Sequence, residues 1–518
     1  MRVVWLLCLV AALFDDGVVG ELSPPDKSYK ILVPIPVIGR SHWNMFKPLL
    51  EALALRGHQI VTMQPFPPKF HNPNITELVL PNVGFLSPSN QFEGTNALAG
   101  GLHLLKEPLT ITAAHFYTLP EVKKYYSKRK EFDLIITDHL FNEVVYPFAV
   151  GLPFITLATP GLEPRQSAML GNVLHPAYAP SVLKDYPFPL SFIDRLKNLF
   201  YHLYVPGYWR VWGIVPLIQK AVSTHLPDAP PLLDIEKNTS LTLLNSHFSF
   251  TKAMPLLPTQ VEVGGMHCVP GKPLTQELAS WVEGAGPSGV IFFSLGTVVS
   301  GNTMPVKYLN LFIEAFARLD YRFIWKFDTV LKNVSTNVLM GPYFPQQDIL
   351  ADHRVKLIIT HGGMMSTQEA IHHATPVVAI PVFGDQPKNA MEIMRQGIGV
   401  ALAWDDLTVD LIINTINEVI NNPRYQRNVK QLSKRMRDQL QSPLERAVYW
   451  TEYVIRHQGA PHLKSPAAQI SWVEFFMLDV LIFLLLCIIA IYLTLRKILR
   501  AVCNLFYCGV GHWKVKME

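Results

Sequence analysis

Apolar residues in the first half of the chain form short runs that alternate with helical repeats and polar turns. Residues 46–55 have helical spacing and stop just before Gly57, a residue that commonly ends helices. A loop over residues 36–41 precedes this helix, and Gly39 is its turn residue. Runs of strand length, apolar enough to be buried on both faces of a parallel sheet, occupy residues 29–35, 60–63, 132–137 and 154–157. The order of these segments predicts β-α-β units.

A second pattern of the same kind begins at Gly289. Helices are expected over residues 308–318 and 367–373, and strands over residues 290–294, 323–326, 355–360 and 376–381. Residues 255–273 are rich in Pro and Gly, which favours a domain boundary there. The fold class is therefore α/β, with two doubly wound domains, residues 21–265 and 266–460, facing each other across a cleft.

Between these patterns, residues 176–231 are rich in Pro and aromatic residues and have mixed periodicity. We expect a partly helical region there. Apolar and aromatic residues between Phe188 and Trp212 fit an apolar pocket or a membrane-facing surface, although ordinary core packing would give the same composition.

Both ends of the chain carry hydrophobic segments. Residues 1–20 have a basic start, an apolar stretch and small residues before a cleavage site after Gly20, as in a signal peptide; an uncleaved anchor is the alternative. Residues 473–495 are long enough for a transmembrane helix, with a buried core helix as the weaker alternative. Arg496, Lys497 and Arg500 follow and predict a cytosolic tail, residues 496–518, of a type I membrane protein.

Composition narrows the classes of protein further. The net charge is only +5 over 518 residues, without a dense run of Lys or Arg, which argues against nucleic acid as a partner. Of the five cysteines only Cys268 lies between the two hydrophobic segments, so an internal disulfide or a cysteine-based metal site is excluded there. The acceptor sequons for N-glycosylation begin at Asn74, Asn238 and Asn333.

The strongest chemical signal lies between residues 343 and 386, YFPQQDILADHRVKLIITHGGMMSTQEAIHHATPVVAIPVFGDQ. A strand, a Thr-His-Gly-Gly turn and a helix place free backbone N–H groups at a helix N-terminus, which suits a diphosphate. The F-P-Q, T-H-G-G, S-T-Q-E-A and G-D-Q-P motifs resemble the donor-binding signature of the UDP-glycosyltransferase family. The resemblance covers nearly the whole chain, including G-R-S-H at residues 39–42 and F-S-L-G-T at residues 293–297. It implies a GT-B fold of two Rossmann-like domains, with one C-terminal transmembrane helix.

Donor-binding roles follow from the residue types and from this resemblance. His361 and Ser366 can donate to phosphate oxygens, and Gly363 allows close approach of the backbone. The resemblance assigns the nucleoside and the sugar to other residues: Tyr343 to uracil, Gln346 to the nucleoside, Glu369 to the ribose, and Asp385 and Gln386 to the sugar hydroxyls. A second glycine turn toward the diphosphate contains Ser294, Gly296 and Thr297. Two positions depart from the family, which commonly has Trp at Tyr343 and often Asn at Met365.

The resemblance makes His42 the general base and Asp138 the carboxylate that orients it. Imidazole suits removal of a hydroxyl proton near neutral pH, and a paired carboxylate fixes its tautomer. We interpret His139, His372 and His373 as structural. The chain has no D-x-D triplet, and Asp405-Asp406 precedes a predicted helix as a cap, so we expect neither a metal nor another cofactor.

These features predict an inverting hexosyltransferase that takes its sugar from a UDP-sugar, glucose in preference to glucuronic acid, and transfers it to a small lipophilic acceptor. The alternative, supported only by Tyr343 and Met365, is a binding protein of the same fold without catalysis. A receptor ectodomain would require paired cysteines and a modular repeat, and the sequence has neither. Lys514 and Lys516 resemble the dilysine retrieval signal of the endoplasmic reticulum, whose membrane is the predicted location, and a homo-oligomer is compatible with the pattern.

Overall fold

The computed structural model describes residues 22–81, 98–181, 183–184, 186–296, 304–329 and 331–514. The predicted signal peptide, Thr297 and Lys516 lie outside the described residues. The chain divides into two compact units, one ending at Lys464 and the other beginning at Ser465.

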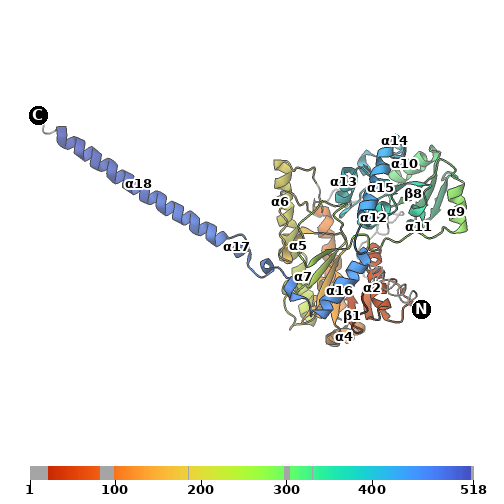
Figure 1. The fold of residues 1–518 in the computed structure, drawn as a ribbon, viewed down its shortest axis with the longest axis horizontal. Coiled ribbons are helices and arrows are strands. Elements are labelled where there is room, and N and C mark those ends of the chain that lie inside the picture. The colour runs from red at the N-terminus through yellow and green to blue at the C-terminus, as the bar shows by residue number, and fades with distance from the viewer. Residues whose placement is uncertain are drawn as a thin grey trace, which may run out of the picture. The chain divides into compact units, whose positions relative to one another are not determined.

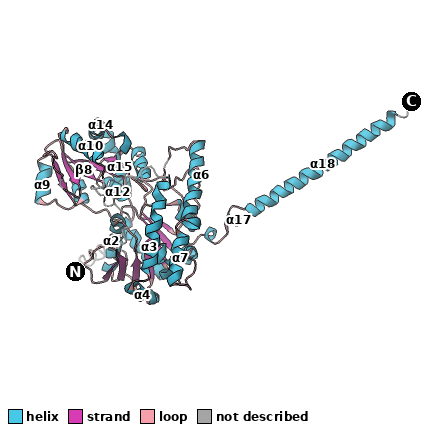
Figure 2. Ribbon diagram, turned by 180° about the vertical axis from the view of Figure 1, so that it is seen from behind, coloured by secondary structure: helices cyan, strands magenta, loops and turns pink. Residues whose placement is uncertain are grey.

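The first unit contains two parallel sheets with helices on their faces (Figures 1 and 2). The seven-stranded sheet has the order β3-β2-β1-β4-β5-β6-β7. Its strands are β1 (Lys30–Pro34), β2 (Gln59–Gln64), β3 (Ile75–Val79), β4 (Leu134–Asp138), β5 (Phe154–Ala158), β6 (Leu241–Leu244) and β7 (Gln260–Glu262). The accompanying helices are α2 (Arg40–Leu55), α3 (Lys106–Phe116), α4 (Pro120–Ser127), α5 (Pro164–Met169), α6 (Phe192–Gly207), α7 (Val215–His225) and α8 (Leu232–Glu236).

The second sheet has six strands in the order β10-β9-β8-β11-β12-β13. Its strands are β8 (Val290–Ser294), β9 (Arg322–Lys326), β10 (Val338–Gly341), β11 (Val355–Thr360), β12 (Val377–Ala379) and β13 (Gly399–Ala401). The helices between and after these strands in the sequence, together with α9 just before them, are α9 (Gln276–Glu283), α10 (Val306–Ala317), α11 (Gln346–Ala351), α12 (Met364–His372), α13 (Gln386–Arg395), α14 (Val409–Asn421), α15 (Pro423–Arg437) and α16 (Pro443–Arg456).

Each sheet is buried on both faces, which is why its strands are continuous apolar runs. Along β1, Ile31 and Val33 belong to the hydrophobic core beside α2, whereas Leu32 belongs to the core on the other face. Along β8, Phe293 and Phe292 divide in the same way between two further cores. These cores fix the carboxyl ends of the strands, where the polar residues of the site begin.

The strand order creates a crevice in each sheet. β1 lies between β2 and β4, and β8 lies between β9 and β11, all in parallel register. After β1 and β8, the chain therefore continues to the strands on one side of them. After β4 and β11, it continues to the strands on the other side. Such topological switch points are where parallel α/β sheets bind ligands.

Helix α2 begins earlier than its apolar spacing predicts. The expectation was a loop over residues 36–41 and a helix from Phe46, but the helix starts at Arg40, with Gly39 as its extended N-cap. Trp43 and Met45 are buried on the inner side of α2, so the helical face begins with them and not with Phe46. His42 consequently lies in the first helical turn.

Helix α16 packs with the first sheet although its sequence follows the second. Ala447, Val448 and Ile455 join the core that contains α2. Glu452 accepts hydrogen bonds from Arg56 Nε at 2.6 Å and pairs with His58 Nε2 at 3.0 Å. The end of the first unit therefore ties the second half of the chain back to the first sheet.

The second unit is α17 (Trp472–Phe475) and α18 (Leu478–Lys514). Among the described residues, the stretch Leu478–Leu505 is the one helix long and apolar enough to cross a membrane. The helix continues through Arg496, Lys497 and Arg500.

Candidate active site

The carboxyl ends of the two sheets line a cleft of about 460 Å³ within the first unit. The first half of the chain contributes Ser41, His42, Asn44, Thr159 and Pro160 to its lining. The second half contributes all the described residues expected to bind the donor, namely Ser294, Gly296, Tyr343, Gln346, His361, Gly363, Ser366, Glu369, Asp385 and Gln386. Residues far apart in the sequence are thus brought to one cavity.

His42 and Asp138 form a close pair at the edge of the first sheet. Asp138 ends β4 and is 1% exposed, and its Oδ2 lies 2.6 Å from Nδ1 of His42, whose side chain is 27% exposed. Burial would raise the pKa of Asp138, but the neighbouring His42 and His139 outweigh it and lower the pKa to about 2. The ionised carboxylate holds the proton on Nδ1, which leaves Nε2 of His42 as a proton acceptor.

Thr159, directly after β5, completes this pair. Its hydroxyl lies 2.8 Å from Nδ1 of His42 and donates to Asp138 Oδ2 at 3.3 Å. The backbone N–H of Leu140 donates to the other carboxylate oxygen at 3.0 Å. Thr159 is not predicted from the sequence, because its only signal is its place after β5, the strand next to β4.

Behind Asp138 lies a buried row of alternating charges. Nδ1 of His139 is 3.5 Å from Asp138 Oδ1, and its Nε2 is 3.7 Å from Glu163. Arg165 pairs with Glu163 at 3.2 Å and lies 3.8 Å from Glu143. Burial would lower the pKa of His139, but the two carboxylates raise it. His139, which the sequence analysis interprets as structural, therefore supports Asp138 from behind.

The turn after β11 encloses the His361 ring between two glycines. A Cβ atom added at Gly363 would lie 2.5 Å from His361 Nε2, and one added at Gly296 would lie 2.6 Å from its Cε1. Gly296 also has a φ of +82°, which favours glycine. Burial and the nearby Lys326 lower the pKa of His361 to about 4, so its ring is a neutral hydrogen-bond donor.

Gly363 is the N-cap of α12, and the free N–H groups of the first turn open toward the cleft beside Ser366. On the other strand end, Ser294 Oγ accepts from the backbone N–H of Gly296 at 3.3 Å. Lys326 at the end of β9 donates to the carbonyl of Gly296. Lys326, a cation at the end of a strand beside the switch point, is not predicted from the sequence as a site residue.

Glu369 and Gln346 form a polar group one turn along α12. The amide of Gln346 donates to Ser366 Oγ at 3.1 Å and to the Glu369 carboxylate. Burial raises the pKa of Glu369 to about 7. His267 Nε2 lies 3.7 Å from that carboxylate. Tyr343 borders the same end of the cleft with 78% of its surface exposed, which leaves its ring available to a planar base.

Asp385 and Gln386 shape the loop after β12. Asn389 Nδ2 donates to Asp385 Oδ2 at 2.8 Å. The Gln386 side-chain oxygen accepts from the backbone N–H groups of Val382 at 2.8 Å and Phe383 at 3.0 Å. The oxygen of the Gln386 side chain is therefore engaged by the loop itself.

Met365, where the resemblance expects Asn, has a different neighbourhood. Its side chain packs against the first sheet's core, and its carbonyl lies 3.2 Å from His267 Nε2. The side chain thus links the two halves of the unit.

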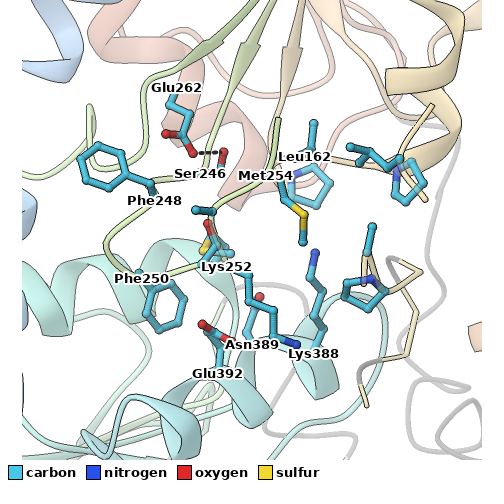
Figure 3. A pocket seen from close by; sticks show the side chains of 18 of the residues that line it. Leu162, Ser246, Phe248, Phe250, Lys252, Met254, Glu262, Lys388, Asn389 and Glu392 are labelled. Carbon is cyan, nitrogen blue, oxygen red and sulfur yellow. Dashed lines mark hydrogen bonds between the residues drawn. The ribbon is translucent and has the colours of Figure 1, made fainter. Parts of the chain in front are cut away.

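Figure 3 shows a second, mostly apolar pocket. It adjoins the cleft, because Pro160 and Met364 line both. Its apolar walls include Leu162, Phe248, Phe250, Met254 and Leu256. Lys252, Lys388 and Glu392 also line it, and Ser246 donates to Glu262 at 3.0 Å at its upper wall in the figure.

The predicted modification sites differ in accessibility. Asn238 and Asn333 are exposed. Asn74 is half-buried, and its side-chain nitrogen, the atom that would carry a glycan, donates to the Ala54 carbonyl at 3.0 Å. Lys514 is the last residue of α18.

The comparisons with known proteins agree with this arrangement. The family model described as "UDP-glucoronosyl and UDP-glucosyl transferase" matches residues 123–512. UDP-glucosyltransferase 2 of Dactylopius coccus is 33% identical over 98% of this chain and 99% of its own length. UDP-glucuronosyltransferase 2B23 of Macaca fascicularis is 30% identical over 88% of this chain and 90% of its own length.

Among solved structures, the kitacinnamycin glycotransferase superposes with a TM-score of 0.58 over 84% of this chain and 100% of its own, at 17% identity. This likeness confirms the predicted GT-B fold. The family match over three quarters of the sequence and the relatives above make the protein an enzyme of the UDP-glycosyltransferase class. The chain belongs to the UDP-glucoronosyl and UDP-glucosyl transferase family.

Proposed function

We propose that this enzyme transfers a hexose from a UDP-sugar to a hydroxyl of a small lipophilic acceptor with inversion at the anomeric carbon. The observation that carries the proposal is that the His42–Asp138 pair faces the same cleft as the glycine turns around His361. A base on one wall and an anion site on the other are the two functions that such a transfer requires.

The donor would lie along the second wall. Uracil would stack on Tyr343, and the ribose hydroxyls would donate to Glu369, with Gln346 beside both. The diphosphate would accept from the N-terminus of α12, Ser366 and His361. On its other side would lie Lys326 and the turn of Ser294, Gly296 and Thr297. Asp385 and the Gln386 amide would hold the sugar hydroxyls.

In the transfer step, Nε2 of His42 removes the proton of the acceptor hydroxyl as its oxygen attacks the anomeric carbon. The new carbon–oxygen bond forms on the face opposite the diphosphate, and the bond from that carbon to the diphosphate oxygen breaks. Asp138 stabilises the imidazolium, as carboxylates do in His–Asp pairs. The negative charge on the leaving UDP is stabilised by Lys326 and the helix N-terminus, so we propose a metal-independent reaction.

The apolar pocket of Figure 3 supports a lipophilic acceptor. It opens beside the cleft at Pro160 and offers Leu162, Phe250 and Met254 to an apolar body. Glucose is favoured over glucuronic acid because the relative named a glucosyltransferase matches over 98% of the chain, against 88% for the relative named a glucuronosyltransferase.

We further propose that the first unit lies in the lumen of the endoplasmic reticulum. This location follows from the predicted signal peptide, the apolar helix α18 and the basic residues in its second half. Asn238 and Asn333 are then the favoured glycan carriers, because both are exposed whereas Asn74 is half-buried. If Lys514 and Lys516 retrieve the protein, replacing both with Ser yields glycans resistant to endoglycosidase H. Glycans that stay sensitive would mean that retention has another source.

The test of the activity is UDP release from UDP-glucose and UDP-glucuronic acid with a panel of phenols, steroids and flavonoids. We expect acceptor-dependent UDP release from UDP-glucose and a product of inverted anomeric configuration by proton NMR. The His42→Ala variant is the matched control. UDP binding without release for any acceptor would favour a non-catalytic binding protein, and a product of retained configuration would exclude the mechanism.

A further inference from the structure

The loop after β5, residues 159–164, contributes alternate side chains to two sites. The residues that line the apolar pocket of Figure 3 are Pro160, Leu162 and Pro164. Thr159 instead contacts His42, 2.8 Å from its Nδ1, and the buried Glu163 reaches His139. The backbone at Glu163 is extended, with φ −119° and ψ 127°, which sends successive side chains to opposite sides. One short loop therefore borders both the pocket and the groups behind the proposed base.

Glu163 and Asp138 hold His139 between two carboxylates. Nδ1 of His139 lies 3.5 Å from Asp138, and its Nε2 lies 3.7 Å from Glu163. The three side chains are at most 4% exposed, and neither ring nitrogen hydrogen-bonds to any other group in the described part of the chain. Burial would lower the pKa of His139, but the two carboxylates more than offset this and raise it. This position therefore favours the charged imidazolium.

Charged groups from several elements surround these three residues. Arg165, on α5, contacts Glu163 at 3.2 Å. Burial would lower the pKa of Arg165, but neighbouring acids raise it, so its guanidinium is charged. Other titratable groups that face Arg165 or His42 are Glu143 and Tyr146 in the 3-10 helix Glu143–Ala149, Glu236 in α8, and Asp385 across the cleft. Loss of the Glu163 charge would therefore leave a cation, Arg165, on that side of His139.

We propose that Glu163 is a positioning residue that keeps a proton on His139 and, through His139, keeps His42 ready to accept one. The charged His139 draws on the Asp138 carboxylate from behind, so it disfavours the doubly protonated form of His42, which cannot act as a base. The role in turnover rests on the proposed function, whereas the charge coupling between the two histidines does not. Because Glu163 belongs to the loop that lines the pocket, one segment holds both the acceptor wall and the support of the base.

The direction of a pH shift distinguishes this role from the simple loss of a charge. Glu163→Gln removes a negative charge, which by itself disfavours a proton on His42. If His139 then loses its proton, because Arg165 opposes it and only Asp138 still favours it, a positive charge closer to His42 disappears as well. A proton on His42 becomes more favourable in that case. The proposal therefore predicts a shift to higher pH, and loss of the carboxylate alone predicts a shift to lower pH.

The test follows the proton on His42 in the full-length protein without substrates. Diethyl pyrocarbonate reacts with unprotonated imidazole, and the side chain of His42 is 27% exposed, so its rate of modification can be followed against pH by peptide mass spectrometry. The pH of half-maximal rate is the His42 midpoint. We expect Glu163→Gln to raise this midpoint by roughly 0.5–1.5 pH units, for loss of a nearby positive charge. The acidic limb of the kcat/KM profile should move by the same amount.

Variants on the same loop and elsewhere locate the effect. His139→Gln should also raise the His42 midpoint, and in that background Glu163→Gln should no longer raise it. The matched control is Glu452→Gln, which removes another buried carboxylate, 3.0 Å from the buried His58, and should leave the midpoint unchanged. Leu162→Ala, on the pocket side of the loop, should raise the KM of the acceptor and also leave the midpoint unchanged.

An unchanged or lower His42 midpoint in a Glu163→Gln variant that binds UDP normally would overturn the inference. An equal upward shift with and without His139 would also overturn it, since the effect would then not act through that residue. If Glu163→Gln does not fold, His139→Gln decides alone, and an unchanged midpoint there would overturn the coupling. Midpoints that shift as expected while His42→Ala retains its turnover would support the coupling and contradict the proposed function instead.

Discussion

The two walls of the cleft carry their charges in different ways. On the first wall, the carboxylates of Asp138 and Glu163 lie beside His42, His139 and Arg165, so acidic and basic groups neighbour each other before any ligand binds. On the second wall, burial lowers the pKa values of His361 and Lys326 and raises that of Glu369, so burial opposes charge on each of these groups.

The difference indicates that the two walls have different roles in the reaction. The proton acceptor is held in one tautomer before any substrate arrives. The donor wall instead offers N–H dipoles and side chains whose charge burial disfavours, and the diphosphate brings the charge. Changes on the first wall should therefore alter turnover, and changes on the second wall should alter nucleotide affinity.

Apart from removal of His42 itself, the largest effect should come from Asp138→Asn. The neutral amide stabilises the imidazolium less and can favour the wrong tautomer of His42, so we expect kcat to fall about 10²–10³-fold. UDP affinity should stay within about twofold. Initial rates at saturating donor and acceptor measure the first quantity, and calorimetric titration measures the second. An unchanged rate would remove Asp138 from the mechanism.

The counterpart on the second wall is Gly363→Ala. The added Cβ would lie 2.5 Å from His361 Nε2, so the ring must move out of the turn. We expect UDP affinity to fall roughly 10- to 100-fold, the cost of overpacking a tight site. In a His361→Ala background the same substitution should cost much less, because the ring is gone. An equal cost in both backgrounds would show that the glycine serves another purpose.

A smaller effect is expected at Tyr343, the exposed ring at the end of the cleft. Tyr343→Ala should weaken UDP binding about tenfold, within the range for loss of one stacked base. Tyr343→Trp should bind UDP as tightly as Tyr or more tightly, because it offers a larger ring. Markedly weaker binding by the Trp variant would show that the base does not stack there.

The smallest effect concerns pH. Glu369 has a pKa of about 7 without ligand, and ribose hydroxyls donate to its ionised form, so UDP binding should lower that pKa and release protons below pH 7. UDP affinity should thus rise with pH up to about 7 and then level off. UDP's terminal phosphate titrates in the same range, so the readout is the difference from Glu369→Gln. Identical pH profiles for the two proteins would contradict this role for Glu369.

The sequence predicted those parts of the fold that depend on local pattern. Strands such as β4 and β11 are continuous apolar runs that end at motif residues, so the place of these residues at the carboxyl edge of each sheet was foreseeable. Short strands such as β7 and β13, with three residues each, have no periodicity to detect and were missed.

Contacts between distant segments were also beyond sequence patterns. Arg56 and Glu452 are separated by 396 positions, so the return of α16 to the first sheet left no local signal. Thr159 and Lys326 were overlooked for the same reason, since each gains its role only from the neighbouring strand. The apolar residues of α6 that the structure leaves exposed were likewise indistinguishable from core-facing ones, because periodicity identifies a face but not its surroundings.

The most direct test of the division between the walls is to measure turnover and UDP affinity on one preparation of His42→Ala. The account predicts that kcat falls about 10³-fold or more, because the proton acceptor is lost. The dissociation constant for UDP should stay within about twofold of the unmodified protein, since the nucleotide is held by the other wall. Near-normal turnover, or UDP affinity lost together with activity in a correctly folded variant, would contradict the account.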